Sequence, residues 1–389
     1  MAASQNYAGL YLVIQPAAGC QLGCPYCGQR HTSARLCPEH QDLVIERVTN
    51  RLRTGRFRRL EVGWFGAEPL VGLPEIRSLA PRLMALATEH GCQYISNITT
   101  NGLALRKEVA TELVKNLGVS DFEITLDGTA EYHDLRRYTK GGSPTFELIF
   151  ANTVALARRE DLEVKVSIRC NVDRQNRDGV FPLLERLALE GLQTKVTFYA
   201  APIYDWGNTA GMRSSPVEEY AAWEANLMVE MVRLGFKPGL LPRPRPITCM
   251  VFKPEAELVD PSGNLFNCTE VSLVPAYSRS VSQGNPLRVI NNNYRHEPTN
   301  VYQIGDLNGA VYPEGRRKLG GFLDDVRSGK YLCHTCPMLP VCGGSCPKLW
   351  LEGQVPFPSA KFNIEQRMLL AYALTRLEEP EAPTEDPTL

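Results

Sequence analysis

Short apolar segments alternate with longer helical segments over the first 200 residues of the chain. Strands are expected at residues 8–14, 59–65, 94–99, 121–126, 163–170 and 195–200, and helices at 39–54, 74–90, 107–117, 144–159 and 181–191. Strands and helices that alternate at these lengths form βα units around a parallel sheet. About six such units predict an α/β fold, built as a partial (β/α)6 barrel rather than a full eight-stranded one.

The pattern changes after residue 203, and this change predicts four parts. They are expected at 1–215 for the partial barrel, 216–248 for a bridging helix and a Pro-rich connector, 249–350 for a small cysteine-rich domain, and 351–389 for a last helix and a disordered acidic tail. The prolines of the connector exclude a regular helix there, and the acidic, Pro-rich composition of the tail favours disorder. Residues 275–312, rich in Asn, Ser and Gly, are expected to form a long insertion or loop.

Length and charge exclude several classes of function. The chain has 389 residues and 43% hydrophobic content, enough for one large domain and a smaller one. A formal net charge of −1 gives no argument for binding to nucleic acid or to a membrane surface. The sequence has no apolar run of about 18 residues and no secretion-signal pattern at its start. We therefore expect a cytoplasmic protein with neither a nucleic-acid nor a membrane partner.

Twelve cysteines are many for a cytoplasmic chain. A reducing compartment disfavours disulfides, so clustered thiols there more often bind metal or do chemistry. Nine of the cysteines fall into three groups along the chain: Cys20, Cys24 and Cys27; Cys249 and Cys268; Cys333, Cys336, Cys342 and Cys346. Of the other three, we expect Cys92 and Cys170 to be structural and Cys37 to be an uncoordinated thiol.

The first group has C-x3-C-x2-C spacing directly after the first predicted strand. Three thiolates on one short loop can hold three irons of a [4Fe–4S] cubane, and the fourth iron then keeps a position open for a substrate ligand. A structural zinc site is the alternative. Zinc normally takes four ligands, and His31 or Cys37 would have to supply the fourth. The position of the motif at the start of a βα series favours the iron–sulfur cluster.

These cysteines and several later segments together resemble the radical S-adenosylmethionine (SAM) superfamily. Gly66-Ala67-Glu68-Pro69 resembles the family's GGEP motif, which binds the SAM amino group, with Ala in place of the second Gly. Residues 99–102 and 125–128 resemble the TNG and S-x-D-G segments. Each alone is an ordinary turn former, but in series at the carboxyl ends of parallel strands they mark a ligand site. The resemblance implies SAM contacts at Gly66, Ala67, Glu68, Thr100, Asn101, Asp127, Ser167 and Arg169.

The later cysteines resemble the SPASM extension of the same superfamily, in which a C-x(9–15)-G-x4-C segment is followed by C-x2-C-x5-C-x3-C and a last Cys. Thirteen residues separate Cys249 from Gly263, and the later spacings agree. The resemblance implies two auxiliary [4Fe–4S] clusters, hence three clusters in all. Their implied ligands are Cys249, Cys268 and Cys346 for one, and Cys333, Cys336 and Cys342 for the other. No cysteine follows Cys346 and none lies just ahead of Cys249, so each auxiliary cluster has three assigned ligands. The alternative is a zinc ribbon on the last four cysteines.

The resemblance implies an enzyme that cleaves SAM reductively to a 5′-deoxyadenosyl radical, which takes hydrogen from a substrate. In SPASM enzymes that substrate is usually a peptide or protein, and the product carries a crosslink, a thioether or an oxidised side chain. We therefore expect maturation of a ribosomally made peptide, with an external electron donor as a second partner. Only about eight residues precede the first strand, so recognition uses the barrel, the insertion or a separate leader-peptide-binding protein.

Three alternatives stay open. A sulfatase-maturating enzyme would carry Asp directly after the cysteine of the G-x4-C segment, Cys268, where this chain has Thr269. A small-molecule dehydrogenase or mutase is the second alternative. A zinc- or cluster-bearing binding module is the third, and the strand ends that fit SAM argue against it. Tyr204, Asp205 and Glu270 are polar residues near predicted strand ends and are expected to be structural.

Overall fold

The computed structural model describes residues 8–206, 208–244, 249–253, 255–279, 287–290, 293–296 and 298–378. The predicted acidic tail, and parts of the predicted connector and insertion, lie outside these residues. None of the helices in the described part of the chain is long and apolar enough to cross a membrane.

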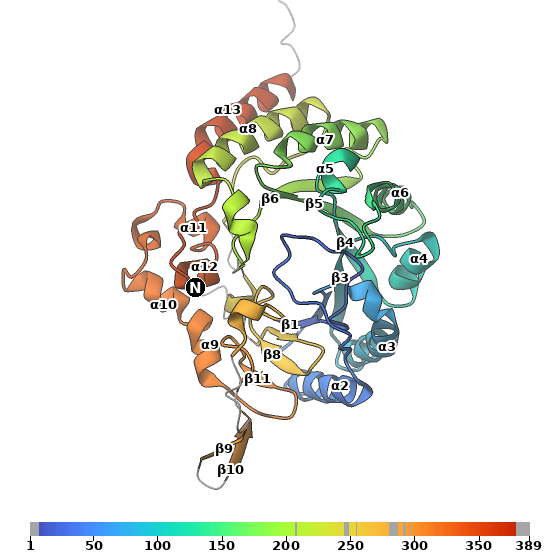
Figure 1. The fold of residues 1–389 in the computed structure, drawn as a ribbon, viewed down its shortest axis with the longest axis vertical. Helices are drawn as coiled ribbons and strands as arrows, with labels where there is room; N and C mark the ends of the chain where they lie inside the picture. Colours follow the sequence, from blue (N-terminus) through green and yellow to red (C-terminus); the bar gives the residue numbers. More distant parts are fainter. Residues whose placement is uncertain are drawn as a thin grey trace, which may run out of the picture.

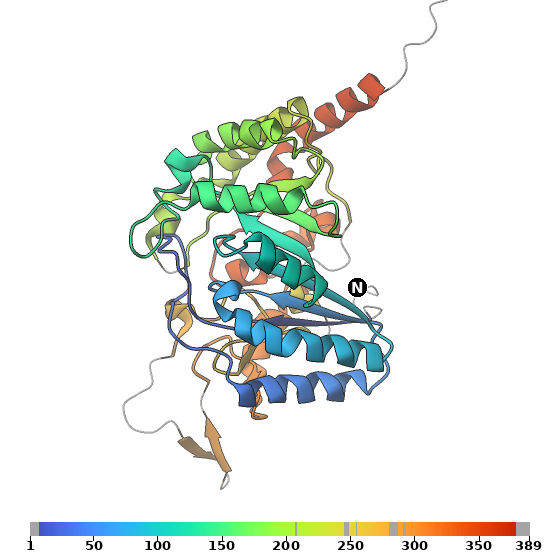
Figure 2. The ribbon, with the colours of Figure 1, turned by 90° about the vertical axis from the view of Figure 1, so that its right-hand side faces the viewer.

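The first half of the chain forms a curved parallel sheet with helices on its outer face (Figures 1 and 2). The strands are β1 (Gly9–Ile14), β2 (Arg59–Trp64), β3 (Gln93–Thr100), β4 (Val119–Thr125), β5 (Lys165–Val172) and β6 (Val196–Pro202). The helices between them are α2 (Pro38–Leu52), α3 (Leu73–Glu89), α4 (Lys107–Lys115), α5 (Ala130–His133), α6 (Phe146–Ala157) and α7 (Val180–Leu189). Each strand pairs in parallel with the next one. The predicted partial (β/α)6 barrel is confirmed.

Alternation along β4 and β5 sets a mainly apolar outer face against a more polar inner face. On β4, Phe122 and Ile124 belong to the core under the helices, whereas Asp121 and Glu123 line an inner cavity. Successive side chains of a strand point to opposite faces, so every second residue is available to the barrel interior. Cys170 on β5 is fully buried in the outer core, as expected of a small apolar residue.

The cysteine-rich region continues the barrel sheet rather than starting a separate one. Strand β7 (Glu257–Val259) pairs in parallel with β1, and β8 (Asn264–Phe266) and β11 (Gly305–Asp306) follow in antiparallel pairing. The sheet therefore has nine strands in the order β11-β8-β7-β1-β2-β3-β4-β5-β6. In this way the edge of β1, which an open barrel would leave unpaired, is covered. The sequence alone did not predict this pairing.

The remaining elements are short, apart from two helices that lie side by side, α8 (Val217–Arg233) and α13 (Ala360–Glu378). The others are α9 (Pro313–Gly320), α10 (Phe322–Arg327), α11 (Leu339–Cys342), α12 (Pro347–Leu351) and the hairpin of β9 (Leu287–Ile290) and β10 (Asn293–His296). The hairpin lies inside the predicted 275–312 insertion, so that segment is not a bare loop. The domain boundaries set from the sequence stay predictions.

A buried carboxylate ties β7 to helix α2. Glu257 is 1% exposed and forms ion pairs with Arg51 at 2.7 Å, Arg47 at 2.8 Å and Arg316 at 3.5 Å. Burial alone would raise the pKa of the Glu257 carboxyl, but the Arg47 and Arg51 guanidinium groups outweigh burial and hold that pKa below its usual range. The cysteine-rich region is therefore anchored to the barrel by charge as well as by strand pairing.

We expect Glu257→Gln to lower the free energy of unfolding by about 3–5 kcal/mol at pH 7, because it leaves arginines beside a neutral buried amide. The folded pKa is depressed, so the contribution is complete above the unfolded pKa of about 4.3 and is lost as pH falls through the folded pKa. The free energies of unfolding of the two proteins, from denaturant titrations, should therefore converge as the pH is lowered below about 4.3. Glu255→Gln, at a half-exposed neighbouring pair, should cost less than about 1 kcal/mol. Equal losses for the two variants would contradict the anchor.

Candidate functional site

The first three cysteines lie on the loop between β1 and α2, and the backbone of a later segment holds this loop in place. Leu22 and Thr139 form an antiparallel bridge. Beside it, the Gly23 amide donates to the Tyr138 carbonyl at 2.9 Å, and the Lys140 amide donates to the Gln21 carbonyl at 2.8 Å. The loop is thus tied to the chain that follows β4, at the carboxyl end of the parallel strands.

The thiols of Cys20, Cys24 and Cys27 are half-buried and close enough to affect one another. Burial raises the pKa of Cys20 to about 11, and it raises the pKa of Cys24 and Cys27 as well. In the described part of the chain, no three side chains of His, Cys, Asp or Glu are arranged to hold a single metal ion. In a cubane each thiolate binds a different iron, and the three thiols of this loop suit that group. His31 lies beside Cys27, with 3.8 Å between Nε2 and Sγ.

The Gly66–Glu68 turn follows β2 in a conformation that favours glycine. Gly66 has φ +87° and Ala67 has φ +47°, so two successive residues are left-handed. A Cβ on Gly66 would lie 1.9 Å from the Gln15 side chain, so only glycine fits there. Ala67, which stands where the family's motif has glycine, adopts a backbone conformation that costs an alanine about 1–2 kcal/mol.

Glu68 is fully buried, and its carboxylate joins the ends of β2 and β3. It accepts hydrogen bonds from the Thr100 hydroxyl at 2.7 Å and from the backbone amides of Asn101 at 2.6 Å and Leu70 at 2.9 Å. Burial raises the pKa of this carboxyl. The predicted contact of Glu68 with the SAM amino group stays a prediction, because the structure gives this residue protein partners that the sequence did not indicate.

Asn101 links the end of β3 to the cysteine loop. Its side-chain amide donates to the Gln21 side-chain oxygen at 3.2 Å and to the Cys20 sulfur at 3.7 Å. Two of the predicted SAM segments, Gly66–Glu68 and Thr100–Asn101, therefore lie together beside the first cysteine of the motif.

Asp127 links the end of β4 to the same loop through Tyr26, which lies between Cys24 and Cys27. The Tyr26 hydroxyl donates to the fully buried Asp127 carboxylate at 2.6 Å. The Arg137 guanidinium donates to the Tyr26 oxygen at 2.8 Å, and the Arg136 guanidinium lies over the Tyr26 ring at 4.7 Å. Sequence reasoning missed Tyr26, Arg136 and Arg137; an Arg-Arg pair just after a predicted site segment was the one available signal.

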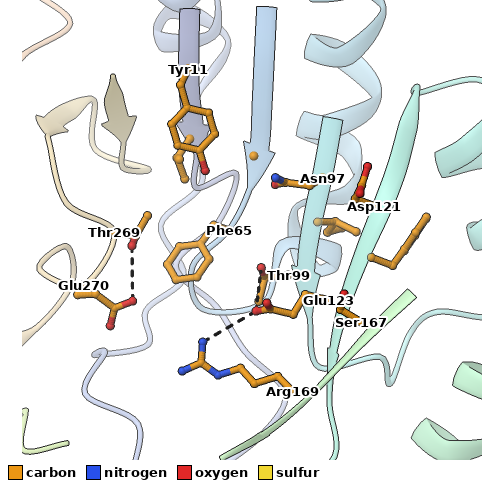
Figure 3. A pocket seen from close by; sticks show the side chains of 14 residues that line it. Tyr11, Phe65, Asn97, Thr99, Asp121, Glu123, Ser167, Arg169, Thr269 and Glu270 are labelled. Carbon is orange, nitrogen blue, oxygen red and sulfur yellow. Dashed lines mark hydrogen bonds and ion pairs between the residues drawn. The ribbon is translucent and has the colours of Figure 1, made fainter. Parts of the chain in front are cut away.

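Ser167 and Arg169 line a cavity of about 360 Å³ inside the barrel (Figure 3). Asn171 links Arg169 to Asp127, because it accepts from the Arg169 side chain at 2.9 Å and its backbone amide donates to Asp127 at 2.8 Å. The cavity is lined by Tyr11, Val13, Gly63, Phe65, Asn97, Ile98, Thr99, Asp121, Phe122, Glu123, Ser167, Arg169, Thr269 and Glu270. Phe65 and Thr99 directly precede the predicted SAM segments of β2 and β3. The cavity therefore lies next to the first residues of those segments and extends from there into the barrel.

The charged groups of the cavity come from opposite walls. Arg169 Nη1 lies 3.9 Å from the Glu123 carboxylate, which also accepts a hydrogen bond from the Tyr199 hydroxyl. Glu270 points inward from the cysteine-rich region, and Thr269 donates to it at 3.5 Å. Burial raises the pKa of the Glu270 carboxyl, and Arg169 opposes that rise. Glu270, expected to be structural, instead lines the cavity directly after Cys268-Thr269.

The six later cysteines form two groups in space, and this grouping does not follow their spacing along the chain. Burial raises the pKa of the Cys268 thiol, and the charges of Glu270, Cys249 and Cys346 raise it further. Cys346 also raises the pKa of Cys249, after burial. Cys249, Cys268 and Cys346 are therefore neighbours, although Cys346 follows Cys342 closely in sequence.

The second group consists of Cys333, Cys336 and Cys342, which line one small hollow together with Trp350 and Phe357. Burial raises the pKa of Cys333 to about 11, and the neighbouring Cys342 and Cys336 raise it too. Cys346 does not line this hollow. The ligand sets that the SPASM resemblance implies for two auxiliary clusters stay predictions.

Comparison with known proteins agrees with this fold. Residues 14–186 match the model of the Radical SAM superfamily. The chain is similar to the solved structure of native anSMEcpe with bound AdoMet, with a TM-score of 0.62 and 15% identity over 94% of this chain and 99% of that one. The structure of anSMEcpe with bound AdoMet and Cp18Cys peptide gives the same TM-score, identity and coverage, 0.62, 15%, 94% and 99%. SuiB of Streptococcus suis bound to the precursor peptide SuiA has a TM-score of 0.55 and 14% identity over 90% of this chain and 74% of that one. At these identities the likeness to solved structures concerns the fold.

Proposed function

We propose that this chain, whose residues 14–186 match the model of the Radical SAM superfamily, is a radical SAM enzyme that matures a ribosomally made peptide by removing hydrogen from one of its side chains. When bound, a [4Fe–4S] cluster on Cys20, Cys24 and Cys27 together with SAM supplies the 5′-deoxyadenosyl radical for that step. The modified peptide would carry a crosslink, a thioether or an oxidised side chain.

The observation that carries this proposal is the position of the barrel cavity. Two of its lining residues, Phe65 and Thr99, directly precede the segments predicted to bind SAM. Two others, Thr269 and Glu270, directly follow Cys268. A target side chain in the cavity would thus lie between the first cysteine group and the first auxiliary one. A volume of about 360 Å³ accommodates one side chain rather than a folded segment.

The residues of the cavity have distinct parts in this proposal. Arg169 is held from one side by the Asn171 side chain at 2.9 Å and by Glu123, so its remaining N–H groups can orient a polar atom of the peptide. Glu270 accepts a long contact from Thr269 at 3.5 Å and offers a carboxylate on the facing wall. Phe65, Val13 and Ile98 add apolar surface to the lining.

Two sources of support favour a peptide over a small molecule. The solved structures with this fold include anSMEcpe with the Cp18Cys peptide and SuiB with the precursor peptide SuiA.

An anaerobic sulfatase-maturating activity is the second candidate, because the fold of anSMEcpe covers 94% of this chain. Thr269, at the position where that class carries Asp, argues against it.

We expect deuterium placed on the target side chain of a short peptide encoded beside the gene to appear in 5′-deoxyadenosine, with a matching mass change in the peptide. The measurement is mass spectrometry of both products after anaerobic incubation with SAM and a one-electron reductant. Glu270→Gln should lower the amount of modified peptide per 5′-deoxyadenosine about tenfold, since a charge-assisted hydrogen bond is worth about 1.5–3 kcal/mol. Glu112→Gln, at an exposed ion pair between α3 and α4, is the matched control. Transfer of deuterium from a small molecule but from no peptide would contradict the proposal.

A further inference from the structure

A buried arginine without a carboxylate partner lies behind the cysteine loop. Arg137 is 6% exposed. Its Nη1 donates to the Tyr26 hydroxyl, and its Nε has no hydrogen-bond partner. Among the ion pairs within the described ranges of the chain, none includes Arg137. Buried charges in proteins are normally paired, because an isolated guanidinium loses its hydration without compensation.

The neighbouring Arg136 is a contrast. Its guanidinium pairs with Asp173 at 3.0 Å and lies 3.5 Å from Asp127. Asp127 in turn accepts from the Tyr26 hydroxyl. Arg136 and Tyr26 contact these carboxylates directly. Arg137 forms no ion pair with them among the described residues, so another anionic group can balance its charge.

The cysteine loop supplies that group. Arg137 begins the segment that pairs with the loop at Leu22, and its guanidinium touches Tyr26, the residue between Cys24 and Cys27. The position is fixed from both ends, because the Arg137 carbonyl accepts a hydrogen bond from the Thr145 hydroxyl. A rigid cation thus stands behind three thiols that carry negative charge when they bind iron.

We propose that Arg137 is the counter-charge of the first cysteine group and raises the reduction potential of the cluster held there. The proposal rests on the proposed function, since it takes Cys20, Cys24 and Cys27 as cluster ligands. Reduction by one electron from the external donor adds a negative charge to the site. A buried cation beside the ligands favours the more negative, reduced form. Arg137 is in this sense a positioning residue, which acts through the thiolates and Tyr26.

The test is a redox titration of the full-length, iron-loaded protein, followed by electron paramagnetic resonance. The signal to follow is the one that changes when SAM is added, which separates the first cluster from the auxiliary ones. In Arg137→Met and Arg137→Gln the ratio of reduced to oxidised cluster at a fixed potential should fall about tenfold, as expected for loss of one charge at partly screened range. That change corresponds to a shift of about 59 mV to lower potential. Arg137→Lys should keep most of the wild-type value. Arg77→Met, at an exposed ion pair, should not change it.

Each outcome decides the proposal. An unchanged potential in both neutral variants with intact iron would overturn it. If both neutral variants lose the first cluster while Arg137→Lys retains it, the positive charge itself holds the thiolates, which supports it. Loss of the cluster in Arg137→Lys as well would show that Arg137 acts through packing and not through its charge, and this result would overturn the proposal. Wild-type protein without any SAM-sensitive signal would instead contradict the proposed function.

Discussion

Replacing Cys20, Cys24 and Cys27 together by alanine should abolish the formation of 5′-deoxyadenosine. The same change should lower the iron content of anaerobically reconstituted protein from about twelve to about eight per chain, at four irons per cubane. The later cysteines, grouped elsewhere, should keep their irons. The measurements are chromatography of the SAM products and a colorimetric iron assay on the same samples.

The control for this variant is Cys37→Ala. Cys37 precedes α2 on the same loop and is also half-buried, so it matches the motif cysteines in exposure but not in spacing. It should leave both SAM cleavage and iron content unchanged. Cleavage of SAM by the triple variant would rule out the assignment of the first cluster. A zinc content of one per chain that disappears in the triple variant would favour the structural zinc alternative.

Local patterns along the sequence were sufficient to predict the barrel. The inner and outer faces of β4 and β5 differ at every second residue, and this alternation is visible without any knowledge of partners. The residues at the strand ends, such as Asn101 and Asp127, could be placed near the cysteine loop because the carboxyl ends of parallel strands share one edge. Their actual partners, Gln21 and Tyr26, depend on the path of the loop, which no local pattern fixes.

Contacts between distant segments could not be predicted. The pairing of β7 with β1 joins Glu257 to Leu12 across most of the chain, and β7 is too short to carry a pattern of its own. In the sequence, Glu270 is one more polar residue after a cysteine. In the structure, the pairing of β7 and β8 with the barrel sheet brings it opposite Arg169. The position of Arg137 beside the cysteine loop likewise becomes evident from its contact with Tyr26. In each case a side chain's role is set by a neighbour that folding brings from elsewhere.

For the later cysteines, the spacing along the chain and the positions in the structure predict different metal sites, and an experiment can distinguish the two predictions. By spacing alone, Cys333, Cys336, Cys342 and Cys346 form one compact set that would suit zinc. In the structure Cys346 lies with Cys249 and Cys268, and the other three line a separate hollow. Two auxiliary clusters with three cysteines each would follow from this division, whereas one ribbon would follow from the spacing.

We expect Cys249→Ala/Cys268→Ala protein to hold about eight irons, and addition of Cys346→Ala to remove none further, because all three cysteines serve one cubane. Addition of Cys342→Ala to the same double variant should instead lower the count to about four, since that thiol serves the other cubane. The two triple variants differ only in which member of the C-x3-C pair is lost, so each is the control for the other. Iron and zinc are measured by elemental analysis after anaerobic reconstitution. Equal iron in both triple variants would contradict the grouping. Zinc that is lost with either Cys342 or Cys346 would identify the ribbon, because a four-thiolate site needs both residues whereas two cubanes divide them.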